Sequence, residues 1–186
     1  MTRIDVNDGT AVLVRAADAE VIGFAPQTVR LLADSSSTGG RLSTQQVTLL
    51  GGADGASPHH HANSAELFYV LSGSVQLLAG DRVHVAGEGD LAVVPPGLPH
   101  AFAAAPASDT DLLIVITPGV ERFGYFRHLA RIAAGQQPAG SLLEVQALYD
   151  TFFDHSPAWR QARSGDLPGS QRPAQAAPTV QSKRFP

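Results

Sequence analysis

The residues of this chain that are best suited to chemistry are histidines and one glutamate near its middle. His59 and His61 are separated by one residue, so on a strand, where side chains alternate between faces, both point the same way and His60 points the opposite way. Glu66 follows a predicted turn and opens the next apolar run, LFYVL. Two imidazoles and a carboxylate oxygen in this arrangement favour a site for a divalent metal ion.

A further histidine follows a stretch rich in glycine and proline. Residues 89–100 read GDLAVVPPGLPH, so His100 begins a strand directly after a predicted type II turn at Pro96-Gly97. The chain has seven histidines and no cysteine, which excludes disulfides, thiolate nucleophiles and any metal site built on sulfur. The other four histidines are interpreted as packing, surface or helix residues: His60, His84, His128 and His155.

These residues form two motifs that resemble those of the cupin superfamily. The first, His-x-His-x4-Glu-x6-Gly, consists of His59, His61, Glu66 and Gly73. The second, Gly-x5-Pro-x-Gly-x2-His, consists of Gly89, Pro95, Gly97 and His100. Two positions depart from the family pattern, since Ala53 replaces a glycine before the first motif and Ala104 replaces an asparagine after the second. Neither position is a metal ligand, so the departures leave the predicted site intact.

The resemblance implies a double-stranded β-helix, or jelly-roll, barrel around one divalent transition metal ion, either Fe, Mn, Ni, Co, Cu or Zn. The implied ligands are His59, His61, Glu66 and His100. Four protein ligands leave positions of an octahedral or bipyramidal ion open, which is typical of catalytic sites. The alternative is a stabilising or empty site in a cupin that is not an enzyme.

The overall layout resembles the quercetin 2,3-dioxygenase type of cupin in its ELFYVLSG strand and its TPGVERFGYFRHLA segment. This implies an oxidoreductase that oxidises a flavonol or a related enol or phenol with O2, with Glu66 as the catalytic acceptor of the hydroxyl proton. Two alternatives stay open. One is a non-oxidative isomerase, cyclase or lyase that acts on an enolisable substrate, and the other is a small-molecule-binding module without turnover.

Strand alternation predicts an apolar chamber beside the ion. If Glu66 faces the barrel interior, then Phe68 and Val70 do so too, and Phe102 follows from His100 in the same way. Such a chamber suits an aromatic small-molecule substrate, although the same residues serve equally well as barrel core. A helical segment after the last strand offers further pocket candidates, as a lid or as a simple cover: Phe123, Tyr125 and Phe126.

The elements that must position these residues are mostly short strands. Ten apolar runs between residues 11 and 118, from AVLVRAA to DLLIVI, predict an antiparallel sandwich or barrel. Gly80-Asp81 fits a two-residue hairpin turn, and Gly73 fits a bulge or kink within a strand. Residues 120–134 show helical spacing, and a second helix is expected from an N-cap at Ser141 to about Phe152.

The sequence therefore predicts a mainly β fold with two short C-terminal helices. The expected divisions are a barrel with N-terminal strands over 1–118, helices packed on it over 119–155, and a flexible basic tail over 156–186. Residues 1–155 carry 8 basic and 16 acidic side chains, whereas residues 156–186 carry 5 basic and 1 acidic. The 44% of hydrophobic residues provides enough apolar material for a core.

Composition and termini also bear on partners and location. The formal net charge of -4 argues against a nucleic-acid partner. The N-terminus, MTRIDVNDGT, lacks the pattern of a signal peptide, and the longest aliphatic run is too short to cross a membrane. We therefore expect a cytoplasmic protein without a membrane partner, and the resemblance to cupins implies a homodimer.

Overall fold

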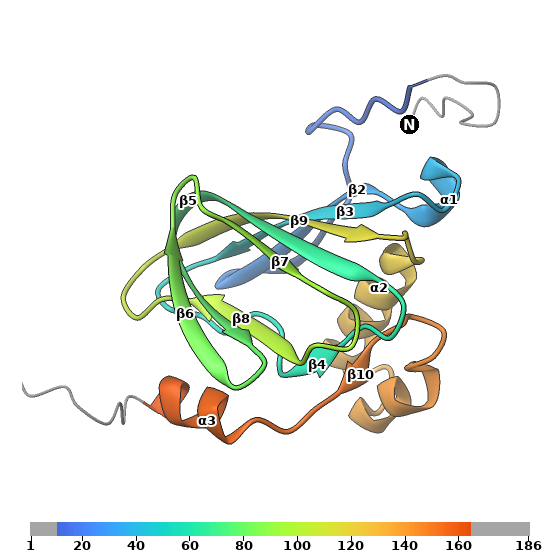
Figure 1. Ribbon diagram of the computed structural model, residues 1–186. Coiled ribbons are helices and arrows are strands. Elements are labelled where there is room, and N and C mark those ends of the chain that lie inside the picture. Colours follow the sequence, from blue (N-terminus) through green and yellow to red (C-terminus); the bar gives the residue numbers. More distant parts are fainter. Residues whose placement is uncertain (1–10, 165–186) are drawn as a thin grey trace, which may run out of the picture.

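The structure is a computed structural model that describes residues 11–164 (Figure 1). Short strands dominate up to residue 117, and helices follow. The strands are β1 (Val21–Phe24), β2 (Gln27–Ala33), β3 (Ser43–Leu49), β4 (His59–His60), β5 (Ala65–Ala79), β6 (Arg82–Gly87), β7 (Leu91–Val94), β8 (His100–Ala104), β9 (Thr110–Thr117) and β10 (Phe152–Phe153). The helices are α1 (Ser35–Thr38), α2 (Arg122–Ala133), the 3-10 helix η2 (Ala139–Val145) and α3 (Pro157–Ser164).

The strands form one strongly curled antiparallel sheet in the order β1-β2-β3-β9-β5-β8-β4-β10, with β6 and β7 also paired to β5. Strand β5 joins the two halves of the barrel, because its first half pairs with β9 and β7 and its second half pairs with β8 and β6. Figure 1 shows this strand crossing the barrel and bending at its upper left. The predicted jelly-roll barrel is thus confirmed.

Gly73 lies at the bend of β5 and permits it. Its φ of 74° belongs to the left-handed region, and a Cβ atom there would lie 1.9 Å from the carbonyl oxygen of Asp109. The pairing of β5 with β9 shifts register just before this position, between Val70 and Ser72. The predicted kink is therefore confirmed, and only glycine satisfies both its backbone conformation and its close contact with β9.

Alternation along the strands fills the space between the two halves of the sheet with apolar side chains. On β3 and the first half of β5, every second residue is buried. The largest fully buried apolar side chains are Phe68, Leu31, Leu49, Leu78, Leu112, Ile114 and Ile116. The predicted two-residue turn also holds, because β5 and β6 pair up to Ala79 and Arg82 on either side of Gly80-Asp81.

Helix α2 forms over the predicted range and is fixed to the barrel at its first residue. Both carboxylate oxygens of Asp34, just after β2, accept hydrogen bonds from backbone amides of α2, at 2.7 Å from Arg122 and 3.2 Å from Phe123. These amides have no partner within the helix, so Asp34 acts as a cap that comes from a distant part of the chain. Among residues 11–164, no helix is long and apolar enough to cross a membrane.

Two sequence-based expectations about secondary structure are wrong. The run AVLVRAA, residues 11–17, is not a strand, and its side chains are exposed because β1 already forms the edge of the sheet. The predicted helix over 141–152 is the 3-10 helix η2, whose N-cap is Pro138; the Ser141 hydroxyl donates to the Pro138 carbonyl instead of capping a helix. After η2 the chain returns to the sheet as β10, which pairs with β4.

The predicted flexible tail over 156–186 is wrong in its first part. Residues 157–164 form α3, which begins at Pro157, a favoured first residue of a helix. Trp159 and Ala162 are buried one turn apart, and Figure 1 shows α3 against the barrel beside β6. Arg163 donates hydrogen bonds to the carbonyls of Gly52 and Ala104. The rest of the predicted tail, 165–186, lies outside the described residues.

Candidate metal centre

Four buried side chains from three strands and one connecting loop meet inside the barrel. His59 on β4 and His100 on β8 are directly paired across the two strands, His61 follows β4, and Glu66 lies near the start of β5. Each exposes 3% or less of its surface. One potential ligand atom from each of the four residues lies within 4.8 Å of the others. The structure therefore brings all four predicted metal ligands together.

Hydrogen bonds on the outer side of the three imidazoles orient them. The Nδ1 atom of His59 donates to the Ser57 carbonyl at 2.8 Å, that of His100 to the Leu98 carbonyl at 2.9 Å, and that of His61 to the Asp150 carbonyl. Such outer hydrogen bonds fix the tautomer of metal-binding histidines and turn Nε2 toward the ion.

The inner nitrogens then face a carboxylate. The Nε2 atoms of His59, His61 and His100 lie 4.0, 3.2 and 2.7 Å from Oε2 of Glu66. A neutral imidazole that donates from Nδ1 carries only a lone pair on Nε2, so three lone pairs and an anionic oxygen converge on one point. A cation at that point satisfies all of them, and three imidazoles with one carboxylate suit a divalent transition metal ion. The residues present therefore fit the metal that the motifs imply.

Burial and neighbouring charges keep two of these groups in the form that binds metal. Burial, followed by the charge of His100, lowers the pKa of His59 to about 3, so His59 is neutral. Burial acts to raise the pKa of Glu66, but with no ion bound and a proton on Nε2 of His100 and His61, the hydrogen bonds that these histidines donate outweigh burial and hold this pKa well below its usual value. Glu66 is therefore ionised at neutral pH.

Asp150 holds the loop between His61 and Glu66, a role that the sequence analysis missed. Its carboxylate accepts hydrogen bonds from the backbone amides of Ala62, Asn63 and Ser64 at 2.9, 3.1 and 3.1 Å. Its carbonyl accepts the bond from His61 described above. Asp150 is buried and has a φ of 46°, which aspartate tolerates better than most residues. It thus positions two ligand candidates at once.

The turn before β8 positions His100. Leu98 donates its amide to the Pro95 carbonyl at 3.3 Å, and Gly97 has a φ of 78°, which confirms the predicted type II turn. The amide of Gly97 also donates to the carbonyl of His61 at 2.7 Å. This bond ties the second motif to the first.

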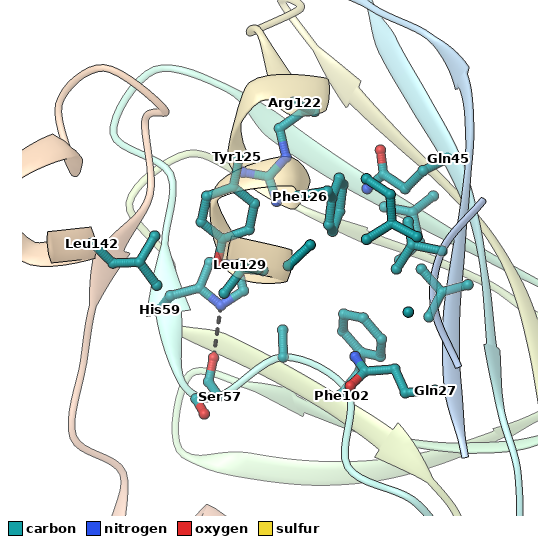
Figure 2. Close-up of a pocket in the computed structure, with 18 of the residues that line it drawn as sticks. Gln27, Gln45, Ser57, His59, Phe102, Arg122, Tyr125, Phe126, Leu129 and Leu142 are labelled. Carbon is teal, nitrogen blue, oxygen red and sulfur yellow. Dashed lines mark hydrogen bonds between the residues drawn. The ribbon is translucent and has the colours of Figure 1, made fainter. Parts of the chain in front are cut away.

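A cavity of about 420 Å³ opens beside the four ligand candidates, and His59 and Glu66 are part of its wall. Of the predicted pocket residues, Phe102, Tyr125 and Phe126 line it (Figure 2). Phe68 and Val70 instead lie in the core, where the Phe68 ring is 5.4 Å from that of Phe102. The structure places Phe123 outside this cavity, against a separate cavity of about 540 Å³ that Asp34 also lines.

Two polar residues of the cavity wall were not predicted from the sequence. Arg122, at the start of α2, is buried, and its guanidinium lies over the Tyr125 ring at 4.3 Å from the ring centroid. Gln45, on β3, is also buried, and its Oε1 atom has no hydrogen-bond partner within residues 11–164. Figure 2 shows both side chains at the cavity, with Arg122 directed inward from α2. Burial of polar groups is decided by tertiary contacts, so no local pattern could have identified them.

The remaining histidines lie away from the ligand cluster. His60 points outward, pairs with Asp154 at 2.9 Å and stacks on Phe152. His84 and His155 are exposed, and His128 on α2 is buried with its Nε2 atom 2.7 Å from the Ser141 hydroxyl. Three histidines therefore face the ligand cluster and four do not, and the outward direction of His60 agrees with strand alternation.

Comparison with known proteins places this site within a family. Residues 45–116 match the family model described as Cupin domain, and this range contains all four ligand candidates. The barrel, the two motifs and this match together show a cupin domain over these residues. A search among curated protein sequences gave no match.

Solved structures share the fold at low sequence identity. KdgF from Halomonas sp. matches with a TM-score of 0.53 and 18% identity over 61% of this chain and 99% of its own. An RmlC-like cupin from Shewanella frigidimarina matches with a TM-score of 0.51 and 18% identity over 61% and 96%. The nucleoside dehydratase Pac13 from Streptomyces matches with a TM-score of 0.50 and 15% identity over 61% and 88%. At these identities the matches establish the cupin fold.

Proposed function

We propose that this protein is a metal-dependent cupin enzyme that catalyses a non-oxidative reaction, an isomerisation, cyclisation or elimination, on a small enolisable substrate. The observation that carries the proposal is the presence of Arg122 and Tyr125 in the same cavity as the ligand cluster. Together they provide a fixed positive charge and a proton donor beside a site that fits a metal ion. Chemistry that passes through an enolate or a related anion needs these groups.

The cavity can stabilise negative charge on a substrate. When bound, a divalent ion supplies Lewis-acid stabilisation of negative charge on a substrate oxygen. Arg122 adds a permanent positive charge within a cavity whose wall is mostly apolar. Coulomb interactions are stronger in such surroundings than in water, and fixed charges need no reorganisation during the reaction. An anionic intermediate is therefore stabilised relative to the same anion in water.

The cavity also contains a proton donor, Tyr125. Burial raises the pKa of Tyr125; the charge of Arg122 opposes this rise and that of Glu66 adds to it. The phenol is therefore protonated at neutral pH, so its hydroxyl can donate a proton. Figure 2 shows the ring reaching from α2 toward His59. We assign to Tyr125 the donation of a proton to the substrate anion or to a leaving group.

Glu66 is assigned the acceptance of the substrate proton, the role predicted for it from the sequence. Its pKa lies well below the usual value, so it is a weak base. The proton that it accepts must therefore be acidic already, such as one α to a carbonyl or on an enol hydroxyl. A proton lost to Glu66 and one gained from Tyr125 change the position of a hydrogen without net oxidation.

The flavonol dioxygenase predicted from the sequence requires O2 in addition to the charge stabilisation and proton transfer that Arg122 and Tyr125 provide. Pac13, which shares this fold at a TM-score of 0.50, is described as a nucleoside dehydratase. Dehydration is an elimination without net oxidation, so the fold accommodates the kind of chemistry proposed. We therefore prefer the non-oxidative reaction.

Proton exchange tests this proposal most simply. The protein is loaded separately with Mn, Co, Ni or Zn and incubated in D2O with β-diketones, keto acids and flavonols. NMR follows the exchange of C–H for C–D and the formation of products, while an electrode follows O2. We expect metal-dependent exchange without O2 consumption, abolished by a chelator and slowed about 100-fold or more by Tyr125→Phe, in line with typical general-acid contributions.

Tyr69→Phe is the matched control, because Tyr69 lies on the outer face of the barrel and is partly exposed. It removes the same hydroxyl group at a distance from the cavity, and its activity is expected to equal that of the unmodified protein. Consumption of O2 in proportion to substrate would overturn the proposal and establish the dioxygenase instead. Tight binding of these compounds to metal-loaded protein without exchange or product would establish a binding module.

A further inference from the structure

We infer that Arg122 binds a carboxylate group of the substrate, so that the substrate class is a small, largely apolar carboxylic acid. This inference deepens the proposed function, on which it depends for the enolisable carbonyl, but the carboxylate subsite itself rests on the surroundings of Arg122. Three observations support it: the buried guanidinium of Arg122 has no carboxylate partner, one of its hydrogen-bonding edges is free, and the net charge of the cavity with a divalent ion is positive.

Arg122 is buried without a counter-ion. It exposes 4% of its surface, and within residues 11–164 no carboxylate oxygen lies within 4.0 Å of its guanidinium nitrogens. Burying an unpaired charge is costly, and the cost is recovered only when an anion binds beside it. By contrast, Arg127 on the same helix is exposed and already paired with Glu20 at 2.5 Å.

The hydrogen bonds of Arg122 leave one edge of the guanidinium available. Nη1 donates to the Thr151 hydroxyl at 2.7 Å, whereas Nε is buried and has no partner among the residues that the structure describes. Nε–H and the adjacent Nη2–H are parallel donors, and this pair matches the two oxygens of a carboxylate. Arg122 thus has one of its hydrogen-bonding edges free for a planar anion.

The position of this edge is fixed before any ligand binds. The guanidinium carbon lies 4.3 Å from the Tyr125 ring centroid and 5.3 Å from that of Phe126, and Figure 2 shows the group between these rings, directed toward the cavity. Cation–π contacts and the Thr151 bond restrict its rotation. The backbone amide of Arg122 is held by Asp34, so both ends of the residue are anchored.

The charges that face the cavity favour an anion. Arg122 and Glu66 are the only charged residues among the described residues that line it. With a divalent ion bound, the cavity therefore has a net charge of about +2, in surroundings of low dielectric that penalise uncompensated charge. A substrate carboxylate lowers this net charge to about +1, and proton transfer from the substrate to Glu66 within the site leaves that total unchanged. The remaining wall is largely apolar and fits a hydrocarbon or aromatic body within about 420 Å³.

A carboxylate fits this subsite better than a phosphate does. Phosphate groups are usually held by several cations or by free amides at a helix N-terminus. Here the cavity has one arginine and no lysine, and the first amides of α2 already donate to Asp34. One planar donor edge suits one planar anion.

Binding of matched neutral and anionic probes tests the inference. Calorimetry measures the affinities of benzoate, benzamide and phenyl phosphate for the full chain, both loaded with Zn and treated with a chelator. Benzoate and benzamide have nearly the same shape and differ in charge. We expect a preference for benzoate of about 10- to 100-fold in both metal states, the range given by hydrogen bonds to charged groups.

Variants of Arg122 assign this preference to its side chain. Arg122→Gln is expected to bring the two affinities within about 3-fold of each other, whereas Arg127→Gln, on the same helix, is expected to leave the preference unchanged. Thermal unfolding shows whether each variant is folded. If Arg122→Gln is not, Arg122→Met preserves the contacts with Tyr125 and Phe126 and serves the same purpose.

Several results would overturn the inference. These are an equal affinity of the unmodified protein for benzoate and benzamide, no binding of benzoate, a benzoate preference that survives in Arg122→Gln, or tighter binding of phenyl phosphate than of benzoate. The same experiments distinguish failure of the carboxylate subsite from failure of the proposed function. Metal-dependent exchange of a neutral β-diketone without a benzoate preference would leave that function standing, and a benzoate preference without any exchange would contradict it.

Discussion

Replacement of Asp150 tests how the loop between two ligand candidates is held. The Asp150 carboxylate accepts three backbone amide bonds, of which the one from Ser64 is buried and the other two are partly buried. Loss of the partner of a buried amide costs about 1–3 kcal/mol, and partly solvated bonds cost about 0.5–1.5 kcal/mol each. We therefore expect Asp150→Ala to lower the free energy of unfolding by about 2–6 kcal/mol.

The asparagine variant separates the charge from the geometry. Asp150→Asn retains one oxygen and the tolerance of a positive φ, but its amide NH2 group faces backbone donors that the carboxylate had accepted. We expect a loss of about 2 kcal/mol. Metal affinity is expected to fall about 10- to 100-fold in both variants, the usual effect of removing an outer hydrogen-bonding partner of ligands.

Urea unfolding and competition with a chromophoric chelator measure the two effects. Asp154→Asn is the control, because Asp154 is partly exposed and pairs only with the outward-facing His60; its loss is expected to cost less than about 1 kcal/mol. If Asp150→Ala unfolds at the same urea concentration as the unmodified protein and binds metal equally well, the assignment of Asp150 to this role is wrong.

Three further predictions concern the rest of the fold. Burial, followed by Glu121, raises the pKa of Asp34 to about 6, above its unfolded value of 3.8, so the stability from this group is greatest below pH 4 and is lost as pH rises through 6. Urea unfolding gives the change in unfolding free energy between pH 4.5 and 7.5 for the unmodified protein and for Asp34→Asn. We expect these two changes to differ by about 2 kcal/mol, and equal changes would contradict the prediction. Gly73→Ala is expected to cost about 3 kcal/mol or more in the same assay, because its Cβ meets the Asp109 carbonyl. The control Gly89→Ala has a similar φ of 84° but open space around it, and it is expected to cost about 1–2 kcal/mol. Equal costs would show that the contact with Asp109 has no effect. The homodimer implied by the sequence stays a prediction. Because Leu91 on the edge strand β7 is 58% exposed, Leu91→Glu is expected to turn the dimer into a monomer, as measured by light scattering. A monomeric unmodified protein would show the prediction to be wrong.

The parts of this protein that could be predicted from sequence are those encoded locally. The spacing of His59 and His61 places both side chains on one face through strand alternation alone. The turn residues Pro96-Gly97 determine where the chain reverses before His100. Each of these inferences needs only a few neighbouring residues, and the motifs add the pairing of the two segments.

The parts that were missed depend on contacts between distant residues. Asp150 lies 89 positions from His61, and nothing in its own neighbourhood indicates that three amides surround it. Arg122 follows a predicted strand as an ordinary helix residue, and only its packing against Thr151 and the rings of α2 buries it. The helix α3 was overlooked because its stability depends on burial of Trp159 against the barrel, a contact that composition does not reveal.

Metal binding by matched histidine variants tests whether the four ligand candidates hold one ion. Equilibrium dialysis against Zn or Co, followed by elemental analysis, gives the number of ions per chain for the unmodified protein, for His61→Ala and for His84→Ala. His84 is exposed on β6 and outside the ligand cluster, so its variant removes an imidazole without touching the site. We expect one tightly bound ion in the unmodified protein and in His84→Ala, and its loss in His61→Ala. Retention of the ion in His61→Ala, or no tightly bound ion in the unmodified protein, would contradict this expectation.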